Sequence, residues 1–390
     1  MKKLRRLAFI LLSLVMIISL AACAGSSSTT NGSVETPNSS GTTPDSANSS
    51  SGSNDEVYEL VFNTFIAEVI QPGRATRATL EYIEEDSGGR IKFKDYWDGT
   101  YISFAETIQA VVTGTIDIGF IDPGHINESF YANQIINMPI EADVPSRLGQ
   151  TQALVQAINE IPELQQELEK IGVMWLGVAS AGSGIIHFAD DVDVRSPDDL
   201  KGMSMEALAA GNELLKECGA SAIGSPVTEW YTSLERNVID ALIHNWGAVD
   251  GFKFYEVTKT HLFFTTEEES DEDSRGLYVS TMGFIMNKDK FESLPQDLQE
   301  ILLYGFGEVF PVKLIEFEMP ACLSGYTAAK ERGNKFIYLE PEEVEEWREK
   351  VASSNKVMLD KIVANGYDAY ALYDKWNAML QAKHDEEKGS

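Results

Sequence analysis

The stretch at residues 196–246 constrains the fold more than any other part of this chain. It opens with Ser196-Pro197-Asp198-Asp199, which is typical of a helix start: a capping hydroxyl, a proline at the first helical position, and acids near the positive end of the helix dipole. Expected strands at 203–207 and 238–245 then alternate with expected helices at 209–218 and 226–236. This alternation predicts an α/β unit with converging strand ends, and ligands of open α/β sheets lie at such ends.

Strand and helix patterns continue to alternate on both sides of this stretch. Further strands are expected at residues 57–64, 90–96, 116–121, 173–180, 185–188 and 278–286. Further helices are expected at residues 71–86, 104–113, 247–257, 294–305, 312–332 and 342–365, with one or two more within 145–171. The helix at 312–332 contains Pro320, which removes a backbone hydrogen bond, so we expect a bend there. At 1.5 Å per residue it would span about 30 Å, long enough to brace two lobes.

Several segments carry a resemblance to a known family. The sequence D-L-K-G-M-S-M occurs at residues 199–205, and P-V-T-E-W-Y-T-S-L-E-R-N-V-I-D-A occurs at 226–241. Supporting matches are S-G-G-R-I at 87–91, the helix-and-strand unit at 105–120, and M-N-K-D-K-F-E-S-L-P-Q-D-L-Q at 286–299. Across residues 58–373, the chain resembles the DctP-type solute receptors of tripartite ATP-independent periplasmic (TRAP) transporters.

The resemblance implies an α/β, two-lobed periplasmic-binding-protein-like fold, with a ligand cleft between the lobes and a long bracing helix. The first lobe would comprise residues 55–183 and 272–311, and the second 184–271 and 312–380, followed by a polar tail at 381–390. We expect the first crossing between the lobes at residues 181–184, where glycines provide a hinge and let backbone amides approach a ligand. An ordinary turn is the alternative reading of this segment.

Glu206 is the main departure from the family pattern. The resemblance places it where these receptors carry an arginine that clamps the carboxylate of the substrate. An arginine binds a carboxylate through two parallel hydrogen bonds, whereas an ionised glutamate repels it. Three interpretations stay open: a structural or salt-bridged carboxylate, an acceptor for a ligand amine or hydroxyl, and a protonated donor to a ligand acid.

Other candidate ligand-binding residues follow expected strands or lie near the mouth of the expected cleft. They are Phe65, Arg77, Tyr101, Asp122, His125, Ser183, Asn245 and Trp246. Each has a structural alternative, such as packing between lobes for the aromatic rings or a core position for Trp246. If the solute is an acid, another cation must replace the missing arginine, and Arg74, Arg77 and His125 are the candidates.

Composition limits the partners and the chemistry. The 390 residues include 61 acidic and 31 basic side chains, a formal net charge of −30, which disfavours nucleic acid and anionic lipid headgroups as partners. The histidines have no metal-ligand spacing such as H-E-x-x-H, and dinucleotide and nucleophile-elbow motifs are not found at the glycines of 181–184. We therefore assign no catalytic residue, metal or cofactor. Cys218 and Cys322 are expected to be buried, inert thiols, with a disulfide between them left open.

The first 54 residues are typical of a bacterial lipoprotein. Residues 1–6 are basic and residues 7–20 are apolar, which predicts a signal peptide at 1–22. Leu20-Ala21-Ala22-Cys23 resembles a lipobox, so Cys23 would become the lipidated first residue after cleavage. Residues 24–54, rich in Ser, Thr, Gly and Asn, then predict a flexible tether with a reach of about 30 Å. The expected location is extracytoplasmic, lipid-anchored to a bacterial membrane at the cell surface or in the periplasm.

The expected function is that of a solute receptor. It would capture a small polar solute, an organic acid by family habit, and deliver it to the membrane permease subunits of a TRAP-type transporter. It would not be an enzyme. Two alternatives stay open: a ligand-sensing lipoprotein subunit of a signalling system, and an extracytoplasmic hydrolase.

Overall fold

The structure is a computed structural model that describes residues 56–122, 130–207, 211–225, 227–268, 270, 272–273 and 275–389. These residues belong to a single compact unit that begins at Asp55. The expected signal peptide, the lipidated Cys23, the tether and His125 lie outside the described residues.

The first sheet has five strands in the order β2-β1-β3-β10-β4. Their bounds are Tyr58–Asn63 for β1, Ile91–Tyr96 for β2, Ile118–Ile121 for β3, Val173–Ser183 for β4 and Val279–Asn287 for β10. β1 runs parallel to β2 and β3, whereas β10 is antiparallel to both β3 and β4. Because the chain forms all but one of the strands of the second sheet between β4 and β10, it leaves this sheet after β4 and returns to it with β10.

The second sheet has six strands in the order β11-β9-β5-β8-β6-β7. Their bounds are Ile185–Phe188 for β5, Ser204–Glu206 for β6, Ser221–Ala222 for β7, Ala241–His244 for β8, Thr260–Phe263 for β9 and Lys335–Tyr338 for β11. β6 is parallel to β7 and β8, and β5 is antiparallel to β8 and β9. The alternation expected within residues 196–246 is confirmed, although β7, β9 and β11 have no counterpart among the expected strands.

The first crossing between the sheets lies at Gly184, between the end of β4 and the start of β5. Gly184 falls within the segment 181–184 expected for the crossing, but β4 continues to Ser183, which pairs with Val279 of β10, so only Gly184 lies between the two strands. The returning segment passes the same point, where Leu277 N donates to Gly184 O at 3.2 Å. A side chain on Gly276 would collide with that carbonyl oxygen, so the close approach requires glycine.

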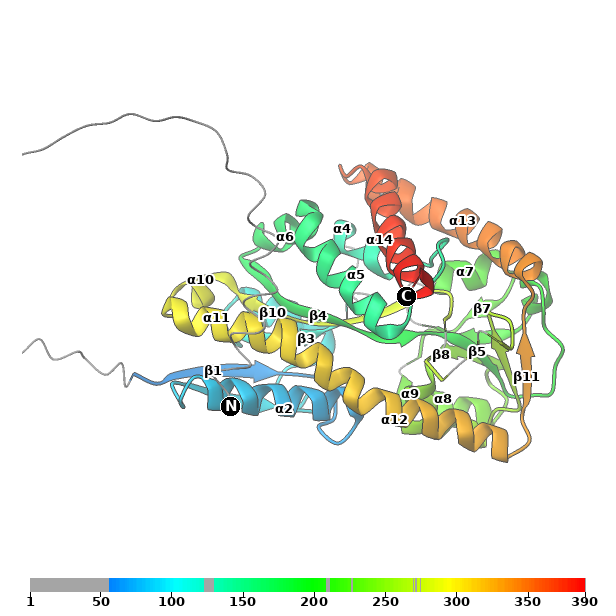
Figure 1. The fold of residues 1–390 in the computed structure, drawn as a ribbon, viewed down its shortest axis with the longest axis horizontal. Coiled ribbons are helices and arrows are strands. Elements are labelled where there is room, and N and C mark those ends of the chain that lie inside the picture. Colours follow the sequence, from blue (N-terminus) through cyan, green and yellow to red (C-terminus); the bar gives the residue numbers. More distant parts are fainter. Residues whose placement is uncertain are drawn as a thin grey trace, which may run out of the picture. The chain divides into compact units, whose positions relative to one another are not determined.

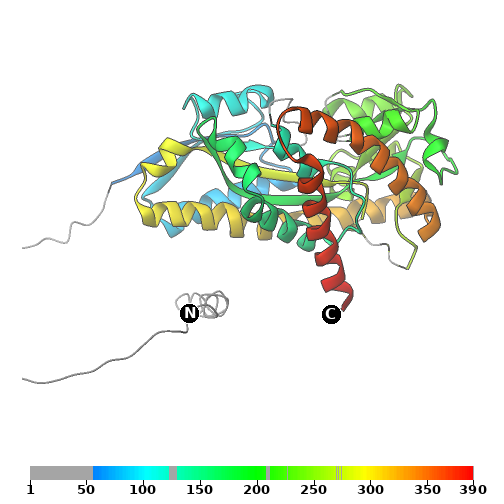
Figure 2. The ribbon, with the colours of Figure 1, turned by 90° about the horizontal axis from the view of Figure 1, so that it is seen from above.

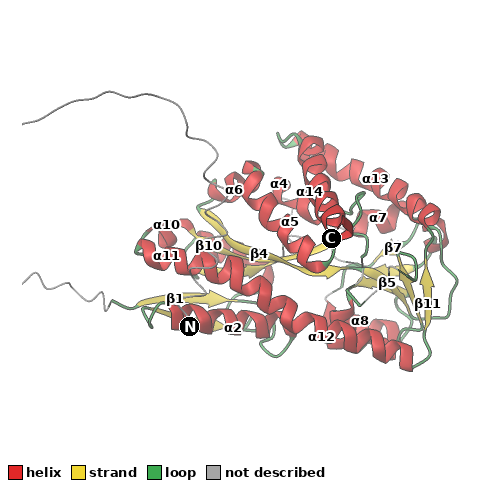
Figure 3. Cartoon of the chain, viewed as in Figure 1, coloured by secondary structure: helices red, strands yellow, loops and turns green. Residues whose placement is uncertain are grey.

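Helices cover both sheets (Figures 1 and 3). Their bounds are Gln71–Asp86 for α2, Thr107–Val112 for α3, Tyr131–Gln134 for α4, Arg147–Glu160 for α5, Pro162–Glu169 for α6, Gly211–Glu217 for α7, Val227–Glu235 for α8, Trp246–Gly251 for α9, Lys288–Glu292 for α10, Gln296–Tyr304 for α11, Phe310–Glu331 for α12, Pro341–Ala364 for α13 and Ala369–Gly389 for α14. The helix expected at 247–257 ends early, because Lys253 adopts the left-handed region with φ of 60°.

Alternate residues of the first sheet enter two different cores. Phe284 of β10 packs with side chains of α2, α11 and α12, whereas its neighbour Ile285 packs with side chains of α5, α6 and α14. This is the two-residue period of a strand buried on both faces. In Figure 1, α2 and α12 lie on one side of the sheet and α5 and α6 on the other.

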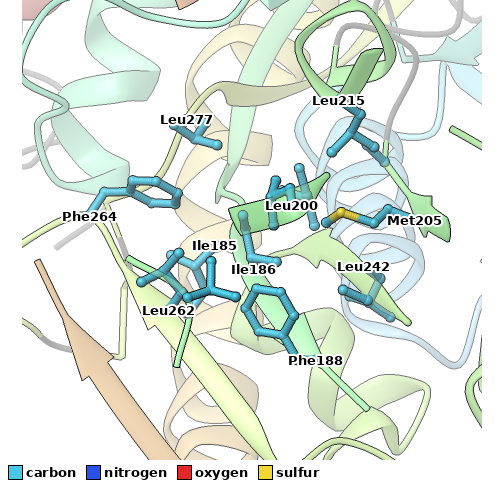
Figure 4. Packing of buried hydrophobic residues seen from close by; sticks show 14 of the residues in the cluster. Ile185, Ile186, Phe188, Leu200, Met205, Leu215, Leu242, Leu262, Phe264 and Leu277 are labelled. Atoms are coloured by element: carbon cyan, nitrogen blue, oxygen red, sulfur yellow. The ribbon is translucent and has the colours of Figure 1, made fainter. Parts of the chain in front are cut away.

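The second sheet has its own core, part of which is drawn in Figure 4. Ile185, Ile186 and Phe188 of β5 lie there with Met205 of β6 and Leu242 of β8, all no more than 1% exposed. Both faces of this sheet are therefore occupied by apolar side chains, as expected for strands that read as continuous hydrophobic runs.

Helix α12 takes part in the cores of both sheets, which confirms the expected bracing helix. Phe310 and Leu314 in its first half pack with the first sheet, and Cys322 and Ala329 in its second half pack with the second sheet. Pro320 lies between these two halves.

The two last helices also connect the cores. Trp347 and Val351 of α13 pack with the second sheet, while Leu359 of the same helix packs with the first. α14 then packs along α5 through its own apolar stripe, and its last turns project beyond the neighbouring helices (Figure 2). Among the described residues, none of the helices is both long and apolar enough to cross a membrane.

Candidate ligand-binding site

The strand pairing brings the carboxyl ends of β1 and β3 to one edge of the first sheet. These parallel strands end at Asn63 and Ile121. The antiparallel strand β10 begins at the same edge, with Val279 beside Ser183 of β4. The ends of β1 and β3 therefore face toward the first crossing.

The second sheet presents the same kind of edge to the crossing. Its parallel strands β6 and β8 end at Glu206 and His244. His244 pairs with Ile185, the first residue of antiparallel β5, which follows Gly184 directly. Carboxyl ends of parallel strands from both sheets thus meet at the crossing, which is the arrangement expected of a ligand cleft in a two-lobed α/β protein.

Two hydrogen bonds hold the end of β8 against the crossing strands. Asn245 Nδ2 donates to Ala181 O of β4 at 2.8 Å, and the Tyr278 hydroxyl donates to Ile243 O at 3.3 Å. Both donors are buried, at 3% and 2% exposure. The two edges are therefore joined by direct side-chain bonds as well as by the connecting backbone.

Glu206 is fully buried at the end of β6, and its carboxylate faces the loop after β7. Its oxygens accept hydrogen bonds from Gly224 N and Ser225 N, each at 2.9 Å, and from the Ser225 hydroxyl. Hydrogen bonds from backbone amides fix the position of this carboxylate. The side chain thus holds the 224–225 loop against β6, an arrangement consistent with the structural interpretation.

Asp122, Ser183 and Phe65 lie at the ends of three strands of the first sheet. Asp122 directly follows β3 and is 5% exposed, and Ser183 ends β4 with no exposed surface. Phe65 follows β1, and its ring centroid lies 4.4 Å from that of Phe104 and 5.9 Å from that of Phe120. The structure therefore brings these three residues to the edge that faces the crossing.

Asn245 and Trp246 follow β8, but their side chains are engaged inside the protein. Asn245 Oδ1 caps α9 by accepting from Ala248 N at 2.8 Å, while its Nδ2 bonds Ala181. Trp246 is fully buried, with its ring stacked on Phe336 of β11 at 6.0 Å and edge-on to His187 at 4.9 Å. These ring contacts with β5 and β11 account for the buried position of the Trp246 side chain.

Tyr101, Arg77 and Arg74 lie farther along the first sheet and are also partnered. Tyr101 is 46% exposed and stacks on Tyr96 at 4.5 Å between centroids. Arg77 pairs with Glu68 at 2.7 Å and Asp95 at 2.6 Å and lies over the ring of Trp97. Arg74 lies over the ring of Phe317 of α12, 4.5 Å from its centroid.

A buried ion cluster beside the crossing was not expected from the sequence. Arg147 starts α5 and is 1% exposed. Its guanidinium donates to Ala181 O and to Asp273 Oδ1 at 2.9 Å, and its Nη1 lies 3.5 Å from Glu318 Oε2. A side chain on Gly182 would collide with this guanidinium, so β4 can pass here only with glycine.

One guanidinium faces two carboxylates in this cluster. Burial raises the pKa of Glu318 to about 7, and the charge of Arg147 offsets only part of that effect. Glu318 Oε2 makes no hydrogen bond to any described residue. Because Arg147, Asp273 and Glu318 are far apart in the sequence, only the tertiary fold reveals the cluster.

Two buried histidines of the second sheet form a chain of hydrogen bonds. Asn334 Nδ2 lies 2.9 Å from His261 Nε2, the two histidine Nδ1 atoms are 2.7 Å apart, and His187 Nε2 lies 3.1 Å from His244 O. All three contacts are satisfied if Asn334 donates to His261, His261 to His187, and His187 to the carbonyl. Both rings are then neutral, and burial lowers the pKa of His187 to about 3.

Two further features of the described residues concern metal binding and thiol chemistry. No cluster of three or more His, Cys, Asp or Glu side chains that could hold a metal ion occurs among them. Cys218 and Cys322 are both free and buried, and burial raises the pKa of each thiol to about 12. The expected inert thiols are confirmed.

Two lobes, an inter-lobe crossing and converging strand ends define a two-lobed solute-binding protein. Comparison with known families gives the same result. The chain belongs to the bacterial extracellular solute-binding proteins, family 7 (DctP), whose family model matches residues 71–361.

Curated relatives are distant and carry consistent names. The chain is 24% identical over 245 residues to a solute-binding protein of Verminephrobacter eiseniae, covering 62% of this chain and 68% of the relative. It is 25% identical over 200 residues to the C4-dicarboxylate-binding protein DctB of Bacillus subtilis, covering 50% of this chain and 55% of the relative. The alignments thus span about half to two thirds of these relatives.

Solved structures of similar fold are TRAP solute-binding proteins. One from Rhodoferax ferrireducens, in complex with copurified benzoate, has a TM-score of 0.70 at 22% identity, covering 85% of this chain and 100% of that one. Another, from a marine metagenome and specific for aromatic acid ligands, has a TM-score of 0.72 at 23% identity, covering 85% of this chain and 99% of that one. These likenesses confirm the two-lobed α/β fold.

Proposed function

We propose that this protein is the extracytoplasmic solute receptor of a TRAP-type secondary transporter, and that it captures a small organic acid and delivers it to the permease. The observation that carries the proposal is the meeting of β1, β3, β6 and β8 carboxyl ends at the crossing of a family 7 chain. Such edges present backbone amides and polar side chains to a ligand enclosed between two lobes.

The solute site in this proposal is built on Phe65, Asp122 and Ser183 of the first lobe. They stand at the edge that faces the second lobe, and an aromatic ring beside polar groups suits a solute with an apolar body and polar substituents. Glu206 acts indirectly by holding residues 224–225 at the facing edge, and Asn245 fixes the end of β8 to β4. The names of the structural neighbours favour an aromatic acid as the first solute class to test.

The proposal includes a lipid anchor and excludes turnover. Lipidation of Cys23 would hold the receptor at the membrane while residues 24–54 let it reach the permease. Binding would proceed without a cofactor, and affinity would come from desolvating the solute between preformed edges. A ligand-sensing lipoprotein with the same fold remains the second candidate, because only the membrane partner distinguishes it.

Native mass spectrometry of the protein purified from residue 55 onward tests the binding function, because the compact unit begins at Asp55. We expect a bound small mass, or a saturable thermal shift with benzoate or 3-hydroxybenzoate. A thermal-shift screen of acids, amines and sugars that yields no ligand would contradict the proposal. Turnover of a bound compound would instead favour the hydrolase.

A further inference from the structure

A cavity of about 320 Å³ lies between α13, the end of α14, residues 140–144, and the segments that follow β9 and β11 and precede β10. This volume is within the range of small-molecule sites. None of the candidate residues for the solute site lines it: its walls include Phe264 after β9, Leu277 before β10, and Trp347 of α13. The cavity is therefore distinct from the strand-end site.

The floor of the cavity is apolar. Phe264, Leu277, Leu339, Trp347 and Val351 contribute to it, and none is more than 8% exposed. Phe264 and Leu277 keep 8% and 5% of their surface exposed, so they are the floor residues that a ligand can reach. A hydrocarbon or aromatic body that covers them would be stabilised by roughly 25 cal/mol for each Å² removed from water.

The rim carries an excess of positive charge. Arg275, Arg348 and Lys388 line the cavity together with His384, and Asp143 is the single acid among the described lining residues. This balance is the reverse of the whole chain, in which acids outnumber bases by 61 to 31. A local cationic site in an anionic protein concentrates anions against the general repulsion.

Asp143, the acid of this lining, is paired with a cation of the same rim. Asp143 forms an ion pair with Arg348 and lies 3.9 Å from His384 Nε2. Burial acts to raise the pKa of Asp143, but the charge of Arg348 outweighs it and holds that pKa below the ordinary value. The side chain of Arg348 is 32% exposed, and its Nη1 also lies 3.6 Å from Oε2 of the exposed Glu345. A bound carboxylate would compete with Glu345 for that nitrogen while Arg348 stays paired with Asp143.

The walls of the cavity come from both lobes. Trp347 and Val351 belong to the core of the second sheet, whereas Ile140 and Val144 belong to the core of the first. Gly276, on the returning crossing segment, forms part of the same wall. A bound molecule would therefore contact both lobes and the segment that joins them.

We propose that this cavity is a second binding site, for a small amphipathic anion such as a medium-chain carboxylate. The apolar body would lie against Phe264 and Leu277, next to Trp347, and the charged group would face Arg348 and Lys388. The proposal stands independently of the solute proposed for the strand-end site.

Fluorine NMR of the protein labelled with 5-fluorotryptophan separates the two sites. Trp347 lines the cavity, while Trp246 lies next to the strand ends. Each resonance is assigned by a Trp-to-Phe substitution, and hexanoate is the probe, with 1-hexanol as its uncharged match. We expect hexanoate to shift the Trp347 resonance saturably and 1-hexanol to bind at least about tenfold more weakly.

Charge variants test which groups select the anion. Arg348→Gln and Lys388→Gln should each weaken the Trp347 response to hexanoate by about three- to tenfold. Lys356→Gln is the matched control, because Lys356 lies on α13 outside the cavity and pairs with Asp360. The exposed Lys388 can be replaced without risk to folding.

Three results would overturn the proposal. They are a Trp347 resonance that hexanoate does not move, an equal response to 1-hexanol, and an effect of Lys356→Gln as large as that of the two rim variants. A response confined to Trp246 would assign hexanoate to the strand-end site and likewise reject the cavity.

Discussion

Two buried glutamates, Glu206 and Glu318, show how differently one protein can hold the same side chain. They are 0% and 4% exposed. Glu206 accepts hydrogen bonds from three donors, the amides of Gly224 and Ser225 and the Ser225 hydroxyl. Glu318 instead shares the guanidinium of Arg147 with Asp273, and its Oε2 accepts no hydrogen bond from the described residues. The degree of burial alone therefore does not determine how a carboxylate is stabilised; the hydrogen-bond donors that face it do.

Removing the shared cation should have the largest effect. Arg147→Met would remove the buried cation that Asp273 and Glu318 share, and we expect a loss of about 4 kcal/mol in the free energy of unfolding. Urea unfolding at pH 7 measures it. Arg77→Met is the control, since its partners Glu68 and Asp95 are partly exposed, and it should cost about 1 kcal/mol. Equal losses in both variants would contradict the role of burial.

Removing the carboxylate of Glu206 should lower the free energy of unfolding slightly less than removing Arg147 does. Glu206→Ala would leave Gly224 N and Ser225 N without their acceptor, and we expect a loss of about 3 kcal/mol. Glu206→Gln keeps one acceptor oxygen and should cost about half as much. Glu213→Ala, at an exposed pair with Lys216, provides a control that should change little. An unchanged free energy of unfolding in Glu206→Ala would mean that other contacts hold the 224–225 loop.

Glu318, which has few hydrogen-bond donors, should make the free energy of unfolding depend on pH. The folded pKa of Glu318 is about 7, above its ordinary 4.5, so the folded state binds more protons between these values and stability falls as pH rises through them. Glu318→Gln abolishes this fall and should gain on the order of 2 kcal/mol relative to wild type between pH 5 and pH 8. Glu316→Gln, on the exposed side of α12, should show no such gain. A pH-independent difference would contradict the raised pKa.

The buried histidine pair should give a smaller dependence of stability on pH than Glu318 does, and of opposite sign. The folded pKa of His187 is about 3, below its ordinary 6.5, so the unfolded state binds the extra proton and stability is lost as pH falls below 6.5. We expect a loss of about 1 kcal/mol per pH unit in this range, which His187→Asn should remove. Comparing wild type with the variant at pH 6 and pH 5 isolates this contribution from that of Glu318.

Local patterns sufficed for most of the fold. Capping signals and apolar runs placed β6, α7, α8 and β8 within a few residues, because those signals act over one helical turn or one strand. The last helix had a readable signal too: Leu372, Tyr373, Trp376 and Leu380 recur at helical spacing and are buried. Extension of β4 to Ser183 was not readable, since it depends on pairing with Val279, far away in the sequence.

Side-chain roles at the site were harder to predict than strand ends. The sequence places Asn245 and Trp246 after a strand, which is correct, but not the direction in which each side chain points. Trp246 turns inward because β11 supplies Phe336, and β11 has no strong strand pattern. Arg147 and Glu318 lie on separate helices, and nothing local indicates that they meet.

The continuity of α12 has a mechanical consequence. A helix of 22 residues anchored in two cores acts as an elastic rod of about 33 Å shared by both lobes. The lobes cannot separate by translation without pulling one half of it out of its core. Relative motion is therefore confined to bending, and the stiffness against it is lowest near Pro320, where the rod lacks one internal hydrogen bond. Glu318 and Cys322, on either side of Pro320, contact Arg147 beside the crossing, so the most flexible point of the helix lies next to the point where the chain passes between the lobes.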